Sequence, residues 1–199
     1  MQLRRCGTDA VLVEVDSLGE VEAVRAVAAG FPDVVELVPA ARTVLIVTRP
    51  GGVAAVRKLL TTADLVHRPE AVGAEVVIEV RYDGPDLDLV AETAGLTTAE
   101  VVELHAGADY RVAFCGFAPG FAYLTGLPEP LRQPRLDSPR TKVPAGSVGV
   151  AGEFTAAYPR ATPGGWRLIG RTDAPLFDPR RPTPALLTPG DRVRFEAVR

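Results

Sequence analysis

The sequence predicts two structural units of different class, an α+β unit over residues 1–80 followed by a mostly-β unit over residues 81–199. Aromatic residues are unevenly distributed, because of the 12 Phe, Tyr and Trp residues only Phe31 precedes residue 82. Proline follows the same trend, with 14 of 18 prolines at or after Pro85. Such a change in composition indicates a domain boundary, which we expect near residues 67–74.

The first unit alternates between the hydrophobic periods of strands and helices. β-branched runs predict four strands, at residues 10–15, 34–38, 43–48 and 75–80. Two helices are predicted at residues 17–30 and 51–60, and Ser17 and Glu20 have the spacing of a capping box in the first. The resulting order, β-α-β-β-α-β, is the ferredoxin-like pattern, which carries no function by itself.

The second unit opens with two predicted helices, at residues 86–94 and 98–104, the second with Thr97 and Glu100 at capping-box spacing. A strand-like run, "YRVAF", follows them. Short β runs then alternate with Gly and Pro, as in "PAGSVGVAG", "EFTAAYP" and "TPGGWRLIG". Short strands separated by turn residues predict a β-barrel or a sandwich.

Composition excludes several classes of function. The formal net charge of −3 and the pI near 5.5 argue against bulk attraction to nucleic acid or anionic lipid. Two cysteines and two histidines give no disulfide framework and no recognisable metal-ligand spacing. No apolar run approaches the roughly 20 residues of a membrane span, and the start is too acidic for a signal peptide. We therefore expect a soluble cytoplasmic protein without a metal.

The predicted helix pair resembles a helix-turn-helix in its spacing, but its charge has the wrong sign for DNA. Between Arg81 and Arg111 there is no Lys or Arg, whereas seven residues are acidic: Asp83, Asp86, Asp88, Glu92, Glu100, Glu103 and Asp109. Phosphate neutralisation supplies most of the affinity for DNA, and acidic helices cannot provide it. A structural helical hairpin that caps the barrel is the better interpretation.

Nucleophilic catalysis has little support in the sequence. No G-x-S-x-G elbow is present, and Cys115 with His105 as its base is weighed against a buried strand cysteine and a packing histidine, which are commoner. No Walker A or G-x-G-x-x-G sequence occurs either. If ATP takes part in the chemistry, we expect it to be held in an unconventional way or by another chain.

The stretches 114–128 and 132–147 together indicate a pocket for a small anion. The first, "FCGFAPGFAYLTGLP", is rich in rings and bent by Gly and Pro, and the second, "RQPRLDSPRTKVPAGS", contains Arg135 and Arg140 in a stiff, basic context. Apolar walls with a few fixed cationic groups form such pockets, and guanidinium groups pair with carboxylates or phosphates. The alternatives are a solvated basic loop and a barrel core with tight corners.

In its motifs the chain resembles the KipI family, which is also that of the 5-oxoprolinase B subunit and of allophanate hydrolase subunit 1. The residues that carry the resemblance are "YDGPDLDLVA", "GLTTAEVVELH", "GFAPGFAYLTGLP", "PRLDSPRTKVPAGSVGVAG", "AYPRATPGGWRLIGRT", "LFDP" and "LLTPGDRVRF", in the family's order. "VVELVPAARTVLIV" is similar to the family's smaller N-terminal domain, so that the resemblance covers nearly the whole chain. One position departs from the family's "GxQTxxYP", because Phe154 stands where a Gln is usual and Glu153 precedes it.

The resemblance implies an α+β N-terminal domain followed by a cyclophilin-like β-barrel. It also implies one subunit of an ATP-dependent 5-oxoprolinase, which works with a larger related barrel subunit (the 5-oxoprolinase C subunit, or allophanate hydrolase subunit 2) and a third subunit. Because no residue of the chain is recognisable as acting in phosphoryl transfer, we expect the subunit to be inactive alone. ATP would be the co-substrate. The candidate substrate-binding residues are Phe117, Pro119, Gly120, Phe121, Tyr123, Arg135, Arg140, Pro144, Ser147, Thr155 and Tyr158; no catalytic residue is assigned.

Three other functions stay open from the sequence. A KipI-like protein inhibits a histidine kinase by binding it, and related domains act on allophanate or other urea-derived amides. A prolyl isomerase is suggested by the cyclophilin-like barrel alone, which is a weak argument because fold does not fix function.

Overall fold

The computed structural model of the chain describes residues 1–65 and 73–199. By its internal packing the chain divides into two compact units, Met1–Ala71 and Val72–Arg199. The connection expected at residues 67–74 lies outside the described residues except for Gly73 and Ala74.

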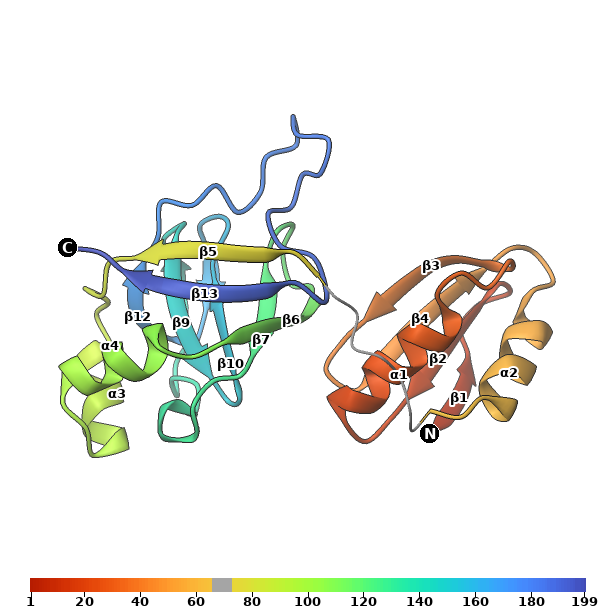
Figure 1. The fold of residues 1–199 in the computed structure, drawn as a ribbon, viewed down its shortest axis with the longest axis horizontal. Coiled ribbons are helices and arrows are strands. Elements are labelled where there is room, and N and C mark those ends of the chain that lie inside the picture. The colour runs from red at the N-terminus through yellow and green to blue at the C-terminus, as the bar shows by residue number, and fades with distance from the viewer. Residues whose placement is uncertain (66–72) are drawn as a thin grey trace. The chain divides into compact units, whose positions relative to one another are not determined.

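The first unit is a four-stranded antiparallel sheet in the order β1-β2-β4-β3, with both helices packed on one face (Figure 1). Its elements are β1 Gln2–Arg5, β2 Ala10–Glu14, α1 Leu18–Ala28, β3 Val34–Pro39, β4 Thr43–Thr48 and α2 Val53–Thr62. Alternate residues of the central strands, such as Val11, Val13, Val44 and Ile46, are fully buried. This period-2 pattern is what a sheet with one covered face requires.

The ferredoxin-like arrangement predicted for this unit is not confirmed. Three of the four predicted strands and both helices are present, but the run at residues 75–80, β5 Glu75–Val80, pairs in parallel with β13 Arg192–Ala197 of the second unit. The place beside β2 is taken instead by β1, which pairs from Gln2 to Arg5. Hydrophobic period identifies a strand but not its partner, and here the partner lies more than 100 residues away in the sequence.

The second unit is built on a seven-stranded sheet in the order β12-β9-β10-β7-β6-β13-β5. Its remaining strands are β6 Tyr110–Cys115, β7 Ala122–Thr125, β9 Ser147–Ala151, β10 Phe154–Ala157 and β12 Arg167–Arg171. Beyond the end of β5, Arg81 and Arg171 exchange two backbone hydrogen bonds of 2.8 Å, which joins the two edges of the sheet. The sheet is therefore nearly closed, as the prediction of a barrel or sandwich required (Figure 1).

The predicted helical hairpin is present as α3 Leu87–Ala94 and α4 Thr98–Ala106, which contact each other and strands β12 and β13. The capping box at Thr97 and Glu100 is confirmed, since each side chain bonds the other's backbone N–H. Ser17 likewise caps α1 by accepting from the Glu20 N–H at 3.2 Å. The short 3-10 helix η1 Glu129–Leu131 follows β7 and contacts both α3 and α4.

Beside the barrel sheet lies a two-stranded sheet of β8 Arg140–Val143 and β11 Thr162–Gly164, in which Arg140 is opposite Gly164. The barrel core is mainly aliphatic, whereas a separate cluster contains Phe121, Tyr158 and Trp166, with Tyr123 and Phe154 packed against it. This aromatic cluster is where the stretches 114–128 and 132–147 of the sequence meet.

Candidate functional site: an aromatic cluster with two arginines

The segment 116–121 forms a tight loop between β6 and β7. The Gly116 N–H donates to the Phe121 carbonyl at 3.1 Å, and the Phe121 N–H donates to the Ala118 carbonyl at 2.9 Å. Phe117, at the centre, has φ 68°, a left-handed conformation that is uncommon for a bulky residue. Its side chain is among the exposed large hydrophobics at 58% exposure, whereas Phe121 is 1% exposed. The loop thus turns one ring outward and buries the other.

Glycine is required at position 120 of this loop. Gly120 has φ 80°, and a Cβ added there would lie 2.9 Å from the Leu176 carbonyl oxygen and 2.6 Å from the Phe177 Cβ. The loop is therefore held directly against residues 176–177, and Pro119 lies exposed beside it. This contact explains how a loop with so few strand-like features is fixed in place.

The structure brings together four of the predicted site residues in one ring cluster. The Phe121 ring centroid lies 5.1 Å from that of Tyr158 and 5.0 Å from that of Tyr123, and Phe117 lies 6.3 Å from Tyr158. Trp166 completes the cluster, 5.6 Å from both Phe121 and Tyr123. These contacts are edge-to-face, which is the favourable arrangement for aromatic pairs.

Both arginines predicted for the site lie near the Tyr158 hydroxyl, and Arg135 also lies near that of Tyr123. Burial raises the pKa of the Tyr158 hydroxyl to about 12, and Tyr123 adds to that shift, while Arg135 and Arg140 act in the opposite direction. Burial also raises the pKa of Tyr123, against which Arg135 again acts. Both phenols therefore stay protonated at neutral pH, with positive charge from Arg135 near both of them and from Arg140 near Tyr158.

Two features hold the Tyr158 side chain in position. A Cβ on Gly164 would lie 2.7 Å from the Tyr158 hydroxyl oxygen, so only glycine leaves room for it in β11. The backbone of Trp166 also forms a hydrogen bond with that hydroxyl. "PGGW" is thus a segment that packs on a buried phenol.

The predicted residues Pro144 and Ser147 belong to a turn that is linked to the ring cluster by backbone hydrogen bonds. The Gly146 N–H donates to the Tyr158 carbonyl at 2.7 Å, and the Tyr158 N–H donates to the Ser147 carbonyl at 2.8 Å. The Ser147 N–H donates in turn to the Pro144 carbonyl at 3.3 Å. The Pro144–Ser147 turn therefore fixes the backbone of Tyr158.

Thr155 lies apart from the ring cluster, in a buried polar network of the barrel. Its hydroxyl donates to the Gly149 carbonyl at 3.1 Å and lies 2.9 Å from His105 Nε2. The hydroxyl proton is used by Gly149, so Nε2 carries a proton and donates to Thr155, and Nδ1 accepts from the Tyr82 hydroxyl at 2.7 Å. Burial lowers the pKa of His105 to about 3, which keeps the ring neutral.

This network does not leave His105 available as a base for Cys115. Both ring nitrogens of His105 are occupied by hydroxyl groups, and the Cys115 thiol lies 3.7 Å from the Leu187 carbonyl. His105 also stacks on Phe195 at 4.7 Å between ring centroids. The alternative that the sequence favoured, a packing histidine and a strand cysteine, fits this geometry.

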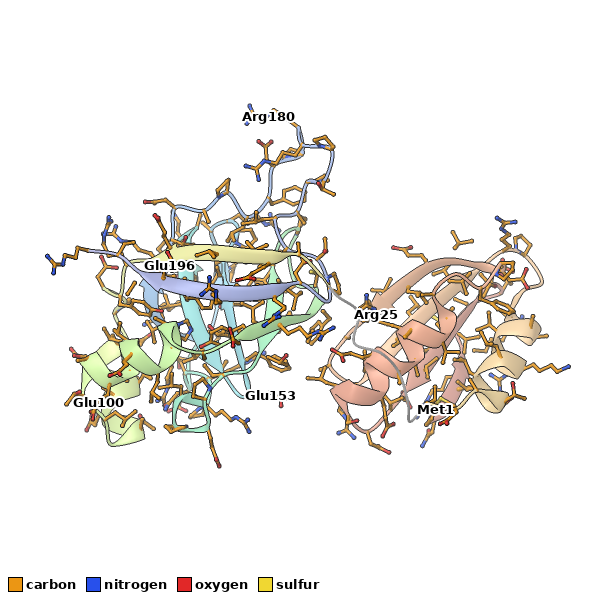
Figure 2. All side chains as sticks on the ribbon, viewed as in Figure 1. Met1, Arg25, Glu100, Glu153, Arg180 and Glu196 are labelled. Carbon is orange, nitrogen blue, oxygen red and sulfur yellow. The ribbon has the colours of Figure 1, made fainter. Side chains whose placement is uncertain are left out.

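The departure at position 154 extends the ring cluster. Phe154 lies with its ring centroid 5.7 Å from those of Phe114 and Tyr123. Glu153 is exposed at the turn between β9 and β10 (Figure 2). An aromatic contact therefore occupies the position at which the family usually has an amide.

Asp86 is a site residue that no sequence pattern predicts, because it is one of seven acidic residues between Arg81 and Arg111. Asp86 is 6% exposed and its carboxylate lies 2.7 Å from Arg140 Nη2. It occupies the N-cap position of α3 without a side-chain capping bond. No pattern in the sequence links position 86 to position 140, because the contact spans 54 residues.

In residues 1–65 and 73–199, no group of three or more His, Cys, Asp or Glu side chains could hold a metal ion. Over the same residues no helix is long and apolar enough to cross a membrane. A hollow of about 370 Å³ lies in the first unit, beside Glu14, Asp16 and Arg42. Its charged groups pair with protein neighbours, Arg42 with Asp16 at 3.3 Å and Glu14 with Arg4 at 2.8 Å, so it is a weaker candidate than the ring cluster.

The fold, an α/β unit followed by a nearly closed barrel, is that of the carboxyltransferase C and D class: residues 1–187 match the family model "Carboxyltransferase domain, subdomain C and D". Over 171 residues the chain is 47% identical to the 5-oxoprolinase B subunit of Escherichia coli O157:H7, a match that covers 83% of this chain and 78% of that protein. The chain therefore belongs to the family of KipI and the 5-oxoprolinase B subunit, which confirms the resemblance in its motifs.

Solved structures share the fold. The crystal structure of TTHA0988 superposes with a TM-score of 0.81 at 35% identity, over 96% of this chain and 40% of that one. The urea carboxylase of Kluyveromyces lactis superposes with a TM-score of 0.73 at 20% identity, over 99% of this chain and 22% of that one, which shows likeness of fold alone. This chain spans less than half the length of either solved protein.

Proposed function

We propose that the chain is the B subunit of a heteromeric, ATP-dependent 5-oxoprolinase that opens 5-oxo-L-proline to L-glutamate. The observation that carries the proposal is the pair of guanidinium groups, Arg135 and Arg140, near the buried phenol of Tyr158 in a ring cluster, with Arg135 also near the half-buried Tyr123. The relatedness to a 5-oxoprolinase B subunit supports the choice of substrate.

The site suits a small ring that carries one negative charge. Arg135 is exposed and close to the Tyr123 and Tyr158 hydroxyls, so its guanidinium is free to pair with the carboxylate of 5-oxoproline. The exposed ring of Phe117 offers an apolar surface for the five-membered ring. A protonated phenol such as Tyr123 is able to donate a hydrogen bond to the lactam oxygen.

The chemistry requires activation of the lactam, because an unactivated amide is slow to hydrolyse. ATP supplies a phosphoryl group to the lactam oxygen, with ADP as the leaving group. Water then adds to the ring carbon that carries the phosphoryl group, the ring C–N bond breaks and the nitrogen takes a proton, which leaves the acyl phosphate of glutamate. A second water hydrolyses this acyl phosphate, and glutamate and phosphate are released. The residues of this chain bind and orient the substrate in this scheme.

The nucleotide and the remaining subunits are also part of the proposal. The sequence has no Walker A or G-x-G-x-x-G motif, so we assign no phosphate contact to this chain and propose that ATP is held by another chain of the enzyme or in an unconventional way. A third subunit completes the enzyme. It follows that this chain alone has no turnover.

Co-expression of the three subunits tests the proposal. We expect ADP release that depends on 5-oxoproline and requires all three chains, with none from the purified B subunit. Robust turnover by this chain alone would contradict the shared site. A stable complex that releases no ADP with 5-oxoproline would instead point to another amide, such as a urea derivative. Failure of the chains to associate would favour the kinase-binding alternative.

A further inference from the structure

Asp86 is buried in the second unit and uses both carboxylate oxygens. Oδ2 accepts from the Leu168 N–H at 2.7 Å, and Oδ1 accepts from Arg140 Nη2 at 2.7 Å. The Asp86 N–H donates back to the Leu168 carbonyl at 2.9 Å, so its backbone is fixed to β12. This carboxylate is thus held in one geometry and in turn holds Arg140.

Arg140 is held on one side only. Its Nη2 is bonded to Asp86, whereas its Nη1 is buried with no hydrogen-bond partner among the described residues. A buried donor without a partner is unfavourable and is rare in folded proteins. Such a donor has capacity left for a ligand or a water molecule.

Backbone pairing places Arg140 near the phenol of Tyr158. Arg140 is opposite Gly164 in the pairing of β8 with β11, and a Cβ on Gly164 would lie 2.7 Å from the Tyr158 hydroxyl oxygen. Arg140 also acts to lower the pKa of Tyr158, against the larger effect of burial. A cation fixed in this way presents positive charge to an anion beside Tyr158 without being reoriented, which is electrostatic preorganisation.

A second pair in the same segment provides the contrast. Asp83 and Arg171 also approach to 2.7 Å, but their side chains are 43% and 58% exposed, against 8% and 29% for Asp86 and Arg140. An exposed pair of this kind contributes little, because solvent screens it. The two pairs share chemistry and differ in burial.

We propose that Asp86 is a positioning residue for substrate binding, which fixes Arg140 beside Tyr158 so that its charge attracts the substrate carboxylate. This inference rests on the proposed function. Under this proposal the two arginines have different roles. The exposed Arg135 pairs with the substrate carboxylate directly, and the partly buried Arg140 attracts it through a positive charge that is fixed in position.

Kinetics of the assembled enzyme test this role. For Asp86→Asn we expect the KM for 5-oxoproline to rise about tenfold, while the KM for ATP changes less than about twofold. Arg140→Gln should have a similar effect, and the double variant D86N/R140Q should be no worse than Arg140→Gln alone, because the two residues act as a unit. The matched controls Asp83→Asn and Arg171→Gln should leave both KM values unchanged.

The double variant also separates positioning from stability. It replaces an ion pair with an amide pair, so thermal unfolding should be closer to that of the unaltered chain than for either single variant, while the KM for 5-oxoproline stays raised. Recovery of the KM together with stability would show a purely structural pair and overturn the inference. A lower KM in Asp86→Asn would do the same, because it would mean that the carboxylate merely repels substrate.

A measurement without substrate keeps the inference testable if the proposed reaction is wrong. In ¹⁵N NMR spectra of the whole chain, the guanidinium signals of Arg140, assigned with Arg140→Gln, should show slow rotation about the Cζ–N bonds. Asp86→Asn should abolish this slow rotation and Asp83→Asn should not. Fast rotation in the unaltered chain would overturn the positioning role, whereas absence of 5-oxoproline-dependent ADP release by the unaltered complex would overturn only the proposed reaction.

Discussion

Two polar groups of residues in the barrel unit differ in how completely their hydrogen bonds are satisfied. In the first, which we call the His105 network, Tyr82, His105, Thr155 and the Gly149 carbonyl form a continuous chain of hydrogen bonds. In the second, the arginine site, Arg140 retains a buried Nη1 without a partner among the described residues. A satisfied buried network stabilises and specifies a fold, whereas an unsatisfied one has capacity left for a ligand.

The sequence suggests that Thr155 and Tyr158 belong to one site, but the structure places them in different groups of residues. Thr155 and Tyr158 lie three residues apart in "TAAY" and are predicted to share one site, yet Thr155 bonds to His105 and Tyr158 belongs to the ring cluster. Neighbouring residues of a strand alternate in direction, and β10 ends at Ala157, before Tyr158. Proximity in a motif therefore does not show that two side chains face the same site.

Removal of His105 should have the largest effect on stability. His105→Ala leaves a cavity and deprives the Tyr82 and Thr155 hydroxyls of a partner, so we expect the free energy of unfolding to fall by about 4 kcal/mol. Trp166, the single tryptophan of the chain, is buried in the same unit and reports unfolding in urea by its fluorescence. A loss under about 1 kcal/mol would contradict the structural role.

The same residue should make stability depend on pH. The folded-state pKa of His105 is about 3, below the ordinary 6.5, so the unfolded chain binds the proton more readily. This contribution is fully present above pH 6.5 and is lost as the pH falls from there toward 3. Between pH 7.5 and pH 5 we expect a loss of about 2 kcal/mol. In His105→Gln this part of the pH dependence should disappear; an identical slope in both proteins would assign it to other groups.

A third prediction concerns the arginine site, where binding should change and stability should not. Arg135 is exposed, so Arg135→Gln should alter the free energy of unfolding by less than about 0.5 kcal/mol. Loss of its pairing with the substrate carboxylate should raise the KM for 5-oxoproline about tenfold, near 1.4 kcal/mol, in the assembled enzyme. Arg132→Gln, at an exposed position in the same stretch, is the matched control. Equal KM values for the two variants would remove Arg135 from the site.

Much of the secondary structure was predictable, because it depends on local patterns. The helix caps at Ser17 and Thr97 follow from residue type and spacing, and the structure confirms both. The sheet assignment of residues 75–80 was not predictable, because β5 reads as a strand in either unit and its partner β13 follows more than 100 residues later.

The candidate site was predictable in composition but not in arrangement. The ring-rich loop and the two arginines were visible as residue types, and the structure brings Phe117, Phe121, Tyr123 and Tyr158 together. Asp86 was hidden because an aspartate at the start of a helix is ordinarily a capping residue. Its burial and its bond to Arg140 depend on tertiary packing, which a single sequence does not display.

The smallest expected effect on substrate binding concerns the exposed ring of Phe117 in the ring cluster. Phe117 adopts φ 68° with its ring 58% exposed, so Phe117→Gly relieves backbone strain while it removes few buried contacts. The relief of strain stabilises the folded chain, whereas the lost contacts and the greater flexibility of glycine in the unfolded chain destabilise it. Because these effects oppose each other, we expect the free energy of unfolding to change by less than about 1 kcal/mol.

The Phe117 ring should contribute more to substrate binding than to the stability of the fold. In Phe117→Gly the KM of the assembled enzyme for 5-oxoproline should rise several-fold. Phe121→Ala is the matched control, because that ring is 1% exposed and its loss should cost about 4 kcal/mol in urea unfolding. If Phe117→Gly destabilised the chain as much as Phe121→Ala, the outward ring would belong to the core. If Phe117→Gly left the KM unchanged, the strained conformation would have no part in substrate binding.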